Sequence, residues 1–327
     1  MENKPTTLKE RFGQIPNETG LTRKMRIHQG WWRTNVLSEE PGTHPKISTQ
    51  NVCNTILNGD TSEKNFLTPN AAKAVRDTLA KWKNNSAGII EQDRLFNNLL
   101  SSQPLCFNFF GELSADYDFG LKVLKTFYPD LTNLISVNFE FSPKENFTKD
   151  GSAFDIAFEV EADNKKGLIG FECKYTDTFS YKPSKSQIFY GDKGNKNHDT
   201  YFAIYENAQE NFVNSYYDFV KHRNYNQLFR NQLIGETLLK NKKYDFLRTG
   251  LFCYHDDDNA IKAASEFKKM LSKPENFQLI TYQDFITNVQ RLELDWKQRE
   301  WTMLLWARYC GISLSSYTTK KLDDNLI

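Results

Sequence analysis

Apolar and polar residues alternate most clearly between residues 151 and 175, and this pattern predicts a β-hairpin. The first arm places these apolar side chains on one face: Phe154, Ile156, Phe158 and Val160. The polar run 163–167 supplies the turn. The second arm places its own apolar series on one face: Ile169, Phe171, Cys173 and Tyr175. Glu172 and Lys174 then share the opposite face.

The position of the turn determines which residues of the two arms face each other. If the turn centres between Asp163 and Asn164, Asp155 lies directly opposite Glu172. Opposed Cβ atoms in such a pair are roughly 4.5–5.5 Å apart, so two carboxylates there repel unless a cation lies between them. A slip of one residue would move these charges to the apolar face, which the alternation opposes.

The charged residues of the hairpin suggest a chemistry. Two acids with a lysine two residues after the second can hold a hard divalent ion through oxygen ligands, with an ammonium group beside it. This arrangement suits phosphodiester hydrolysis, in which negative charge on the phosphate must be stabilised. The alternative is a solvated hairpin face that carries ordinary charges. Glu159, on the same face as Asp155, is either an aid to a second ion or a rim residue.

Helical periodicity and turn residues delimit the other elements. Helices are expected at 69–83, 90–101, 116–127, 200–220, from 225 onward, and at 260–271, 282–290 and 292–309, with strands at 134–141, 244–254 and 277–281. Thr68 is the expected N-cap of the first helix, with Pro69 in its first turn. We therefore expect an N-terminal arm and helical extension over residues 1–88, a core over 89–285 and a C-terminal helix and tail over 286–327.

Composition narrows the class of protein. The 327 residues carry 42 Lys and Arg against 41 Asp and Glu, a net charge of +1, so any surface for nucleic acid must be local. The five cysteines form no Cys-x-x-Cys pair, which predicts reduced thiols in a cytoplasmic protein and argues against a zinc knuckle or a disulfide scaffold. No signal sequence and no apolar run of membrane-spanning length is present, so no membrane partner is expected.

Two segments combine basic and aromatic residues in a way that suits a polyanion. The first contributes Arg23, Arg26, Trp32 and Arg33. The alternative, which we favour over a contact with nucleic acid, is that Trp31 or Trp32 anchors the N-terminal arm on the core. The second contributes Lys182, Lys185 and Lys193 after the hairpin, and its alternative is a solvated charged face.

Three further positions are weaker candidates. The helix that begins near Tyr225 presents Gln227, Arg230 and Asn231 on one face, with Gln232 about 140° round from Gln227. One of its amides, of which Gln232 is taken as the candidate, could position a water or a phosphate oxygen. Glu112 could add an acid from a helix beneath the metal site, or be a surface charge. The run 255–259 contains His and Asp residues but reads better as a loop that begins a helix, where acids favour the helix dipole.

The order helix, strand, Asp-bearing strand, Glu-x-Lys strand, helix, strand resembles the core of the PD-(D/E)XK phosphodiesterase superfamily, and more closely a bacterial family of restriction endonucleases within it. The matching segments run 28–33, 66–68, 102–108, 152–155, 171–175 and 227–233, and so span most of the chain. Two departures are visible. Phe154 stands where the superfamily name has Pro, and the position of a helix glutamate such as Glu112 is not fixed by the resemblance.

The resemblance implies an α/β (α+β) restriction-endonuclease-like core, a central mixed β-sheet flanked by helices in the order αβββαβ, with helical N-terminal and C-terminal additions. It implies Asp155 and Glu172 as ligands of Mg²⁺, for which Mn²⁺ can substitute. Glu112 is the further candidate ligand. Lys174 would steady the attacking hydroxide or the charge of the transition state, and Gln232 completes the candidate catalytic set.

The expected function is therefore a cytoplasmic, metal-dependent DNA endonuclease of restriction type. Duplex DNA is the favoured partner, and cleavage of both strands would go with a homodimer. One alternative is a nucleic-acid-binding module on a nuclease scaffold without turnover, since a fold does not guarantee chemistry. Another is a metal-free protein-interaction domain whose hairpin charges face solvent. Burial of Asp155 and Glu172 in a cleft would count against the latter.

Overall fold

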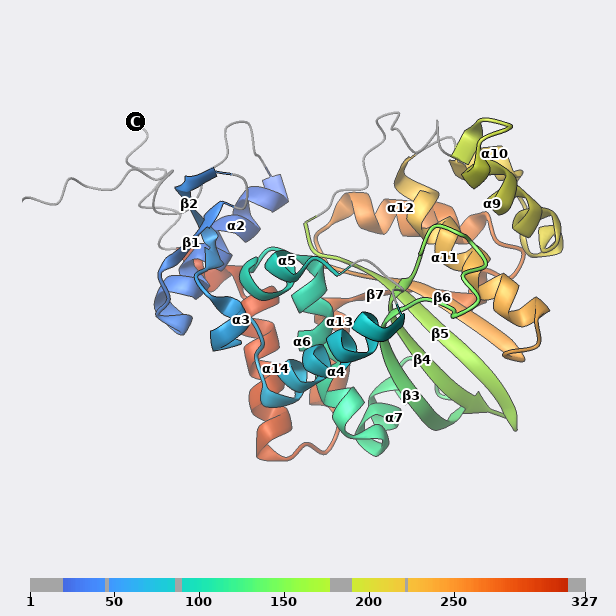
Figure 1. The fold of residues 1–327 in the computed structure, drawn as a ribbon. Helices are drawn as coiled ribbons and strands as arrows, with labels where there is room; N and C mark the ends of the chain where they lie inside the picture. The colour runs from blue at the N-terminus through green and yellow to red at the C-terminus, as the bar shows by residue number, and fades with distance from the viewer. Residues whose placement is uncertain (1–19, 45–46, 86–89, 177–189, 221–222, 317–327) are drawn as a thin grey trace, which may run out of the picture.

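A five-stranded mixed sheet forms the centre of the computed structural model, which describes residues 20–44, 47–85, 90–176, 190–220 and 223–316 (Figure 1). Its strands are β3 (Leu131–Phe141), β4 (Phe154–Ala162), β5 (Lys165–Lys174), β6 (Phe246–Cys253) and β7 (Phe277–Thr281), side by side in that order. Strands β3, β4 and β5 are antiparallel, whereas β5, β6 and β7 are parallel. The carboxyl ends of β3, β5, β6 and β7 therefore lie at one edge of the sheet.

The β4–β5 hairpin has the predicted register. Ile156 pairs with Phe171 and Ala162 with Lys165, so continuing the register by one step sets Asp155 opposite Glu172. The turn residues Asp163 and Asn164 have φ of 51° and 59°, as a two-residue turn that follows the strand twist requires.

The predicted alternation is wrong at one residue of the hairpin. Phe154 does not join Ile156 and Phe158 but packs with Ala157 and Leu168 on the opposite side of the sheet. Its ring lies where a side chain on Gly170 would be, with Cδ1 only 2.4 Å from an ideal Cβ at that position. The strand's alternation thus breaks at the residue before Asp155.

Helices cover both faces of the sheet, as predicted. One face is covered by α6 (Ser102–Ala115), α7 (Tyr117–Lys125), α13 (Tyr282–Gln290) and α14 (Trp296–Tyr309). The other is covered by α9 (Lys196–Glu206), α10 (Tyr216–Val220), α11 (Arg223–Lys240) and α12 (Asp258–Lys269), with short 3-10 turns at Gln209–Asn211 and Pro274–Asn276. A further 3-10 turn, Ile312–Ser315, follows α14 and packs against the core of the first face. Phe109 of α6 packs its ring against Phe252, Tyr282, Phe285 and Tyr309, so one aromatic side chain joins the sheet to two later helices.

The N-terminal region contains more regular structure than its sequence predicts. It consists of α2 (Gly20–Trp32), a π-helix (Arg33–Leu37), the antiparallel strands β1 (Pro41–His44) and β2 (Ile47–Ile56), and the helices α3 (Gly59–Ser62), α4 (Pro69–Asn85) and α5 (Gln92–Asn97). The Thr68 hydroxyl accepts from the amide of Ala71 at 3.1 Å, which confirms the predicted cap of α4.

Polar contacts join α2 to the C-terminal helix. Gln29 donates to the Tyr175 hydroxyl at 2.6 Å and to the Arg308 carbonyl at 3.0 Å. The Arg308 guanidinium is fully buried and donates to the carbonyl of Asn65 at 2.7 Å. None of the helices in the described ranges has the length and apolarity needed to cross a bilayer.

A buried histidine in this interface predicts a pH dependence of stability. His28 is 0% exposed and lies between the Ala307 carbonyl, 2.9 Å from Nε2, and the Ser315 hydroxyl, 3.0 Å from Nδ1. Burial lowers its pKa to about 4. The unfolded histidine binds its proton near pH 6.5. The contribution of neutral His28 to the free energy of unfolding is therefore fully present above pH ~6.5. It is lost as the pH falls towards 4, by at most about 1.4 kcal/mol per pH unit.

We expect the His28→Gln variant to lose this part of the pH dependence. Urea unfolding at pH 7.0, 5.5 and 4.5 measures the free energy of unfolding of both proteins. The wild-type value should fall more steeply than the variant's over this range. Parallel profiles would contradict the assignment.

Candidate active site

Three of the predicted residues lie together at the end of the β4–β5 hairpin. Glu172 and Lys174 are 5% and 7% exposed, and the Lys174 ammonium lies 2.7 Å from Oε1 of Glu172. Asp155 is half-buried, and its Oδ2 accepts a 2.6 Å hydrogen bond from the backbone N–H of Cys173, between the other two residues. The hairpin thus holds two carboxylates and one ammonium group within mutual electrostatic reach.

A third carboxylate, from Glu140 near the end of β3, belongs to the same group. Its charge acts on Asp155, and its Oε1 accepts from the Gln103 side chain of α6 at 3.1 Å. The Glu140 backbone has φ of 48°, in the left-handed region that residues with a side chain rarely occupy. Such strain is often found where a side chain must be directed at a functional site.

Sequence reasoning missed Glu140. Because Phe139 pairs with Ile156 and Phe141 with Phe154, Glu140 lies across from Asp155. This register contains shifts in the first half of β3, and no short turn connects the two strands. The acid could be found from the sequence only if the pairing of β3 were known.

The carboxylates of the site are electrostatically strained. Burial raises the pKa of Asp155 well above its usual range, and the charges of Glu172 and Glu140 raise it further, against the opposing effect of Lys174. Burial also raises the pKa of Glu140 to about 7. The Glu172 charge adds to this rise and the Gln103 hydrogen bond opposes it. Among the described residues of the site, three acids face one lysine, so negative charge is in excess there.

Helices from both faces of the sheet hold the site residues in place. From α11, the Asn231 amide donates to Oε2 of Glu172 at 2.8 Å. From α6, the Cys106 thiol contacts the Asp155 carbonyl at 3.5 Å. From α13, the Tyr282 hydroxyl donates to the Lys174 carbonyl. Each of the three hairpin residues is therefore tied to a different helix.

The structure places Gln232 away from this group, contrary to the prediction. Its Oε1 accepts from the Thr249 hydroxyl at 2.7 Å, and its Nε2 donates to Glu236 at 2.7 Å. Asn231, one residue earlier, is the amide of α11 that reaches the site. One residue is about 100° of helix rotation, so an error of one position in the helix phase selects the wrong side chain.

The other candidate acids also lie elsewhere. Glu112 accepts from the Asn70 amide at 2.8 Å, where α6 meets α4. Glu159 accepts from the Tyr244 hydroxyl at 2.6 Å and pairs with Lys166 at 3.1 Å, at the turn end of the hairpin. In the run 255–259, Asp257 caps α12 through the amide of Ala260, in agreement with the loop interpretation.

The first basic and aromatic segment is largely buried, so its predicted contact with nucleic acid requires correction. Trp32 and Arg33 are 2% and 6% exposed, and Arg33 donates to the Cys53 carbonyl at 2.8 Å. Arg26 is also buried and donates to Asn54. Arg23, at the start of α2, is half-buried. A buried ring cannot stack on a base, so Trp32 is excluded as a stacking residue. Trp32, Arg33 and Arg26 instead hold the N-terminal region together.

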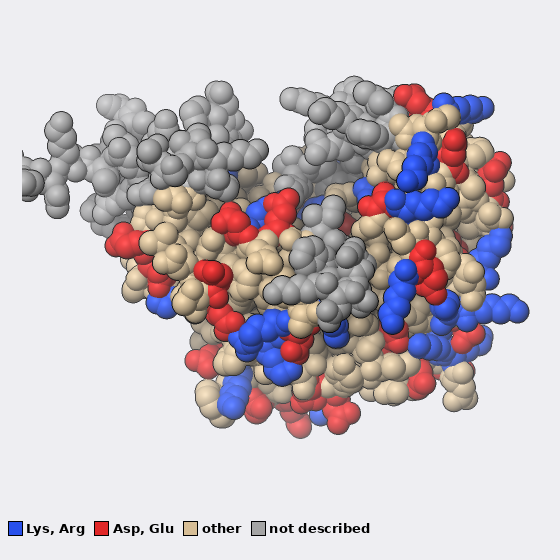
Figure 2. Space-filling view, in the orientation of Figure 1, with Lys and Arg blue, Asp and Glu red and all other residues tan. Residues whose placement is uncertain are grey.

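The remaining basic candidates differ in exposure. Arg230 hydrogen-bonds Ser152 and the Tyr201 hydroxyl, 3.1 and 3.3 Å from its Nε, and lies 3.4 Å from Asp150. Gln227 and Lys193 are exposed, whereas Lys182 and Lys185 lie outside the described residues. Figure 2 shows basic and acidic side chains interspersed on the face in view, in keeping with the small net charge.

The donor set suits a hard divalent cation. Carboxylate oxygens are the ligands that Mg²⁺ prefers, and a cation would relieve the repulsion that raises the pKa of Asp155. Within the described ranges no three His, Cys, Asp or Glu residues form a ready-made metal cluster. Lys174 lies at one oxygen of Glu172 and Asn231 at the other, so both of these oxygens already have a partner. The residues fit a divalent metal chemically, provided that Glu172 exchanges its contact with Lys174 or Asn231 for the metal.

Comparison with known proteins agrees with this geometry. A family profile described as the PD-(D/E)XK nuclease superfamily matches residues 16–311. No curated protein and no solved structure gives a significant match. The profile covers most of the chain, including all five strands of the sheet and the four site residues. The chain therefore belongs to the PD-(D/E)XK nuclease superfamily.

Proposed function

We propose that this protein is a metal-dependent endonuclease that hydrolyses phosphodiester bonds in DNA. The observation that carries the proposal is the convergence of Glu140, Asp155, Glu172 and Lys174 at the ends of three neighbouring strands. A protein-interaction surface has no use for mutually repelling carboxylates withdrawn from solvent in part or in full. A site that recruits a cation to a polyanion needs such a group.

Asp155 and Glu172 would hold the divalent ion, Mg²⁺ or Mn²⁺, with Glu140 as a third carboxylate beside them. The bound ion supplies Lewis-acid charge that neutralises the phosphate and makes water more acidic. The protein's contribution is to place its oxygen atoms in advance. The Cys173 amide orients Asp155, Asn231 orients Glu172 and Gln103 orients Glu140.

Lys174 supplies the site's own positive charge. Its ammonium is nearly buried beside Glu172, where charges interact more strongly than in water. There it can donate to the attacking water or to a phosphate oxygen and stabilise charge that develops during the reaction. The Tyr282 hydroxyl holds the Lys174 backbone, so the ammonium acts from a fixed strand end.

Replacing Lys174 should abolish cleavage without unfolding the protein. In Lys174→Ala we expect nicking of supercoiled plasmid in Mg²⁺ to fall by at least ~100-fold, because the group that stabilises transition-state charge is removed. Lys166→Ala is the matched control, since Lys166 lies on the same strand but is exposed and pairs with Glu159. The control should cut at the wild-type rate.

Magnesium dependence and Asp155→Asn complete this test. Chelation by EDTA should stop nicking by the wild type, and Asp155→Asn should be inactive at every Mg²⁺ concentration. Circular dichroism verifies that each variant is folded. Wild-type protein that shifts the plasmid in a gel without nicking it, whichever divalent salt is added, would instead identify a binding module.

The two neighbouring amides of α11 should behave differently when truncated. Asn231→Ala removes a donor from Glu172, so we expect a roughly 10–100-fold loss of metal affinity or activity, the range usual for residues that orient ligands. Gln232→Ala removes contacts to Thr249 and Glu236 and should lower the thermal unfolding temperature with a smaller effect on cleavage. A larger loss of cleavage in Gln232→Ala than in Asn231→Ala would instead indicate that Gln232 acts at the active site.

A further inference from the structure

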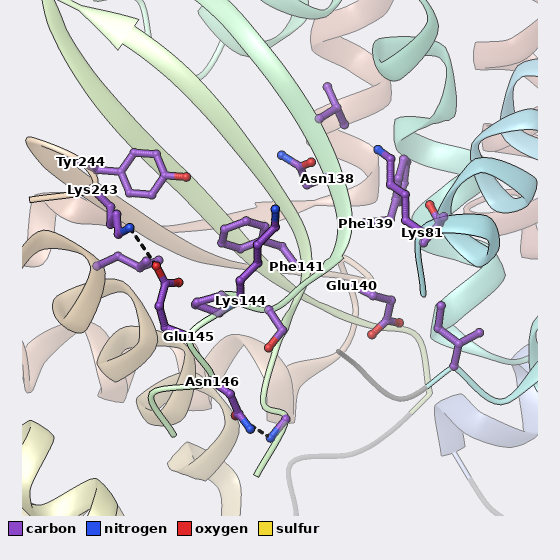
Figure 3. A pocket seen from close by; sticks show the side chains of 17 residues that line it. Lys81, Asn138, Phe139, Glu140, Phe141, Lys144, Glu145, Asn146, Lys243 and Tyr244 are labelled. Atoms are coloured by element: carbon purple, nitrogen blue, oxygen red, sulfur yellow. Dashed lines mark hydrogen bonds and ion pairs between the residues drawn. The ribbon is translucent and has the colours of Figure 1, made fainter. Parts of the chain in front are cut away.

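A cavity runs along the free edge of the sheet and reaches the active site. It has a volume of about 690 Å³ and follows β3 from Val137 to Phe141, so that Glu140 lines both the cavity and the active site. The loop 142–146 continues one wall (Figure 3). Residues of α4 form the other wall, and Tyr244 lies at the far end. A molecule in the cavity would therefore contact Glu140, the carboxylate that the cavity shares with the candidate active site.

Lysines from three separate elements line this cavity. Lys81 comes from α4, Lys144 from the loop after β3, and Lys243 from the loop before β6. Lys81 and Lys144 lie on opposite sides of β3 in Figure 3, and both are exposed. Lys243 pairs with Glu145 at 2.8 Å, an ion pair between half-exposed side chains. The three lysines outnumber the two glutamates of the lining, Glu140 and Glu145, and this small excess of positive charge favours an anion over a neutral ligand.

Between the lysines the lining offers groups that suit nucleobases. The amides of Asn138 and Asn146 can both donate and accept hydrogen bonds, and both side chains line the cavity. Phe141 is only half-buried and adds an aromatic surface. A basic groove with aromatic and amide groups is the general form of a site for single-stranded nucleic acid.

The lining of the cavity suits an unpaired strand better than a double helix. In a duplex the flat faces of the bases stack on one another and are closed to Phe141, whereas an unpaired strand exposes them. We propose that the cavity binds an unpaired polynucleotide strand that continues from the phosphate at the active site. This proposal rests on the proposed nuclease function. It adds that the substrate is unpaired next to the phosphate at the active site.

Binding without metal tests the cavity separately from catalysis. The probes are a 5′-fluorescein-labelled 15-nucleotide thymidine strand and the blunt duplex it forms with its complement, measured by fluorescence anisotropy. The proteins are Asp155→Asn and the same variant carrying Lys81→Glu and Lys144→Glu. The matched control carries Lys297→Glu, a change of an exposed lysine of α14 outside the cavity.

We expect the single strand to bind at least 10-fold more tightly than the duplex, and the double charge reversal to weaken its binding at least 10-fold. Two lost phosphate contacts should reduce the salt dependence, the slope of log K against log salt, by roughly 1.4. Lys297→Glu should change neither value.

Equal binding of strand and duplex, equal loss in the Lys297→Glu control, or displacement of the strand by an equimolar 15-residue glutamate peptide would overturn the proposal. The first result would show no preference for unpaired bases, and the last would show recognition of charge alone. If the strand binds as expected but wild-type protein cuts no polynucleotide with Mg²⁺, the cavity stands and the nuclease function fails. If plasmid is nicked and the strand does not bind, the nuclease function stands and the cavity proposal fails.

Discussion

Repulsion among three carboxylates in a confined space is the constraint on which the site depends. Glu140, Asp155 and Glu172 come from three neighbouring strands, and burial raises the pKa of the first two by disfavouring their ionised forms. Each acid has a fixed hydrogen-bond donor, which keeps it directed at its neighbours despite the electrostatic cost. The sheet supplies the proximity, and α6, α11 and the backbone of β5 supply the donors.

How much of this could be predicted depended on the sequence distance between partners. The β4–β5 hairpin was predictable, because its turn joins the strands directly and a register error would bury charge. Asp155, Glu172 and Lys174 followed from that single register. Glu140 could not be found in this way, since β3 is separated from β4 by twelve residues and its pairing contains irregularities. Phe154 also escaped the alternation, because its ring packs with Ala157 and Leu168 on the other side of the sheet.

Helix phase and burial account for the other differences. Asn231 and Gln232 are adjacent amides on α11, and composition alone does not determine which one faces β5. Trp32 and Arg33 read as a nucleic-acid contact because the residues that bury them, such as Cys53 of β2, are known only once the fold is known. The resemblance to a nuclease family gave the order of helices and strands correctly. The residues that orient the site's acids could be identified only from the contacts in this structure.

The left-handed backbone at Glu140 sets stability and chemistry in opposition at one position. Glycine would adopt this conformation at little steric cost, and is the residue that relieves such strain most directly. It would also remove the carboxylate that joins the active site to the cavity along β3. Selection for stability therefore favours glycine at position 140, and selection for activity favours glutamate. The residue found there in a variant of the chain indicates which of the two has prevailed.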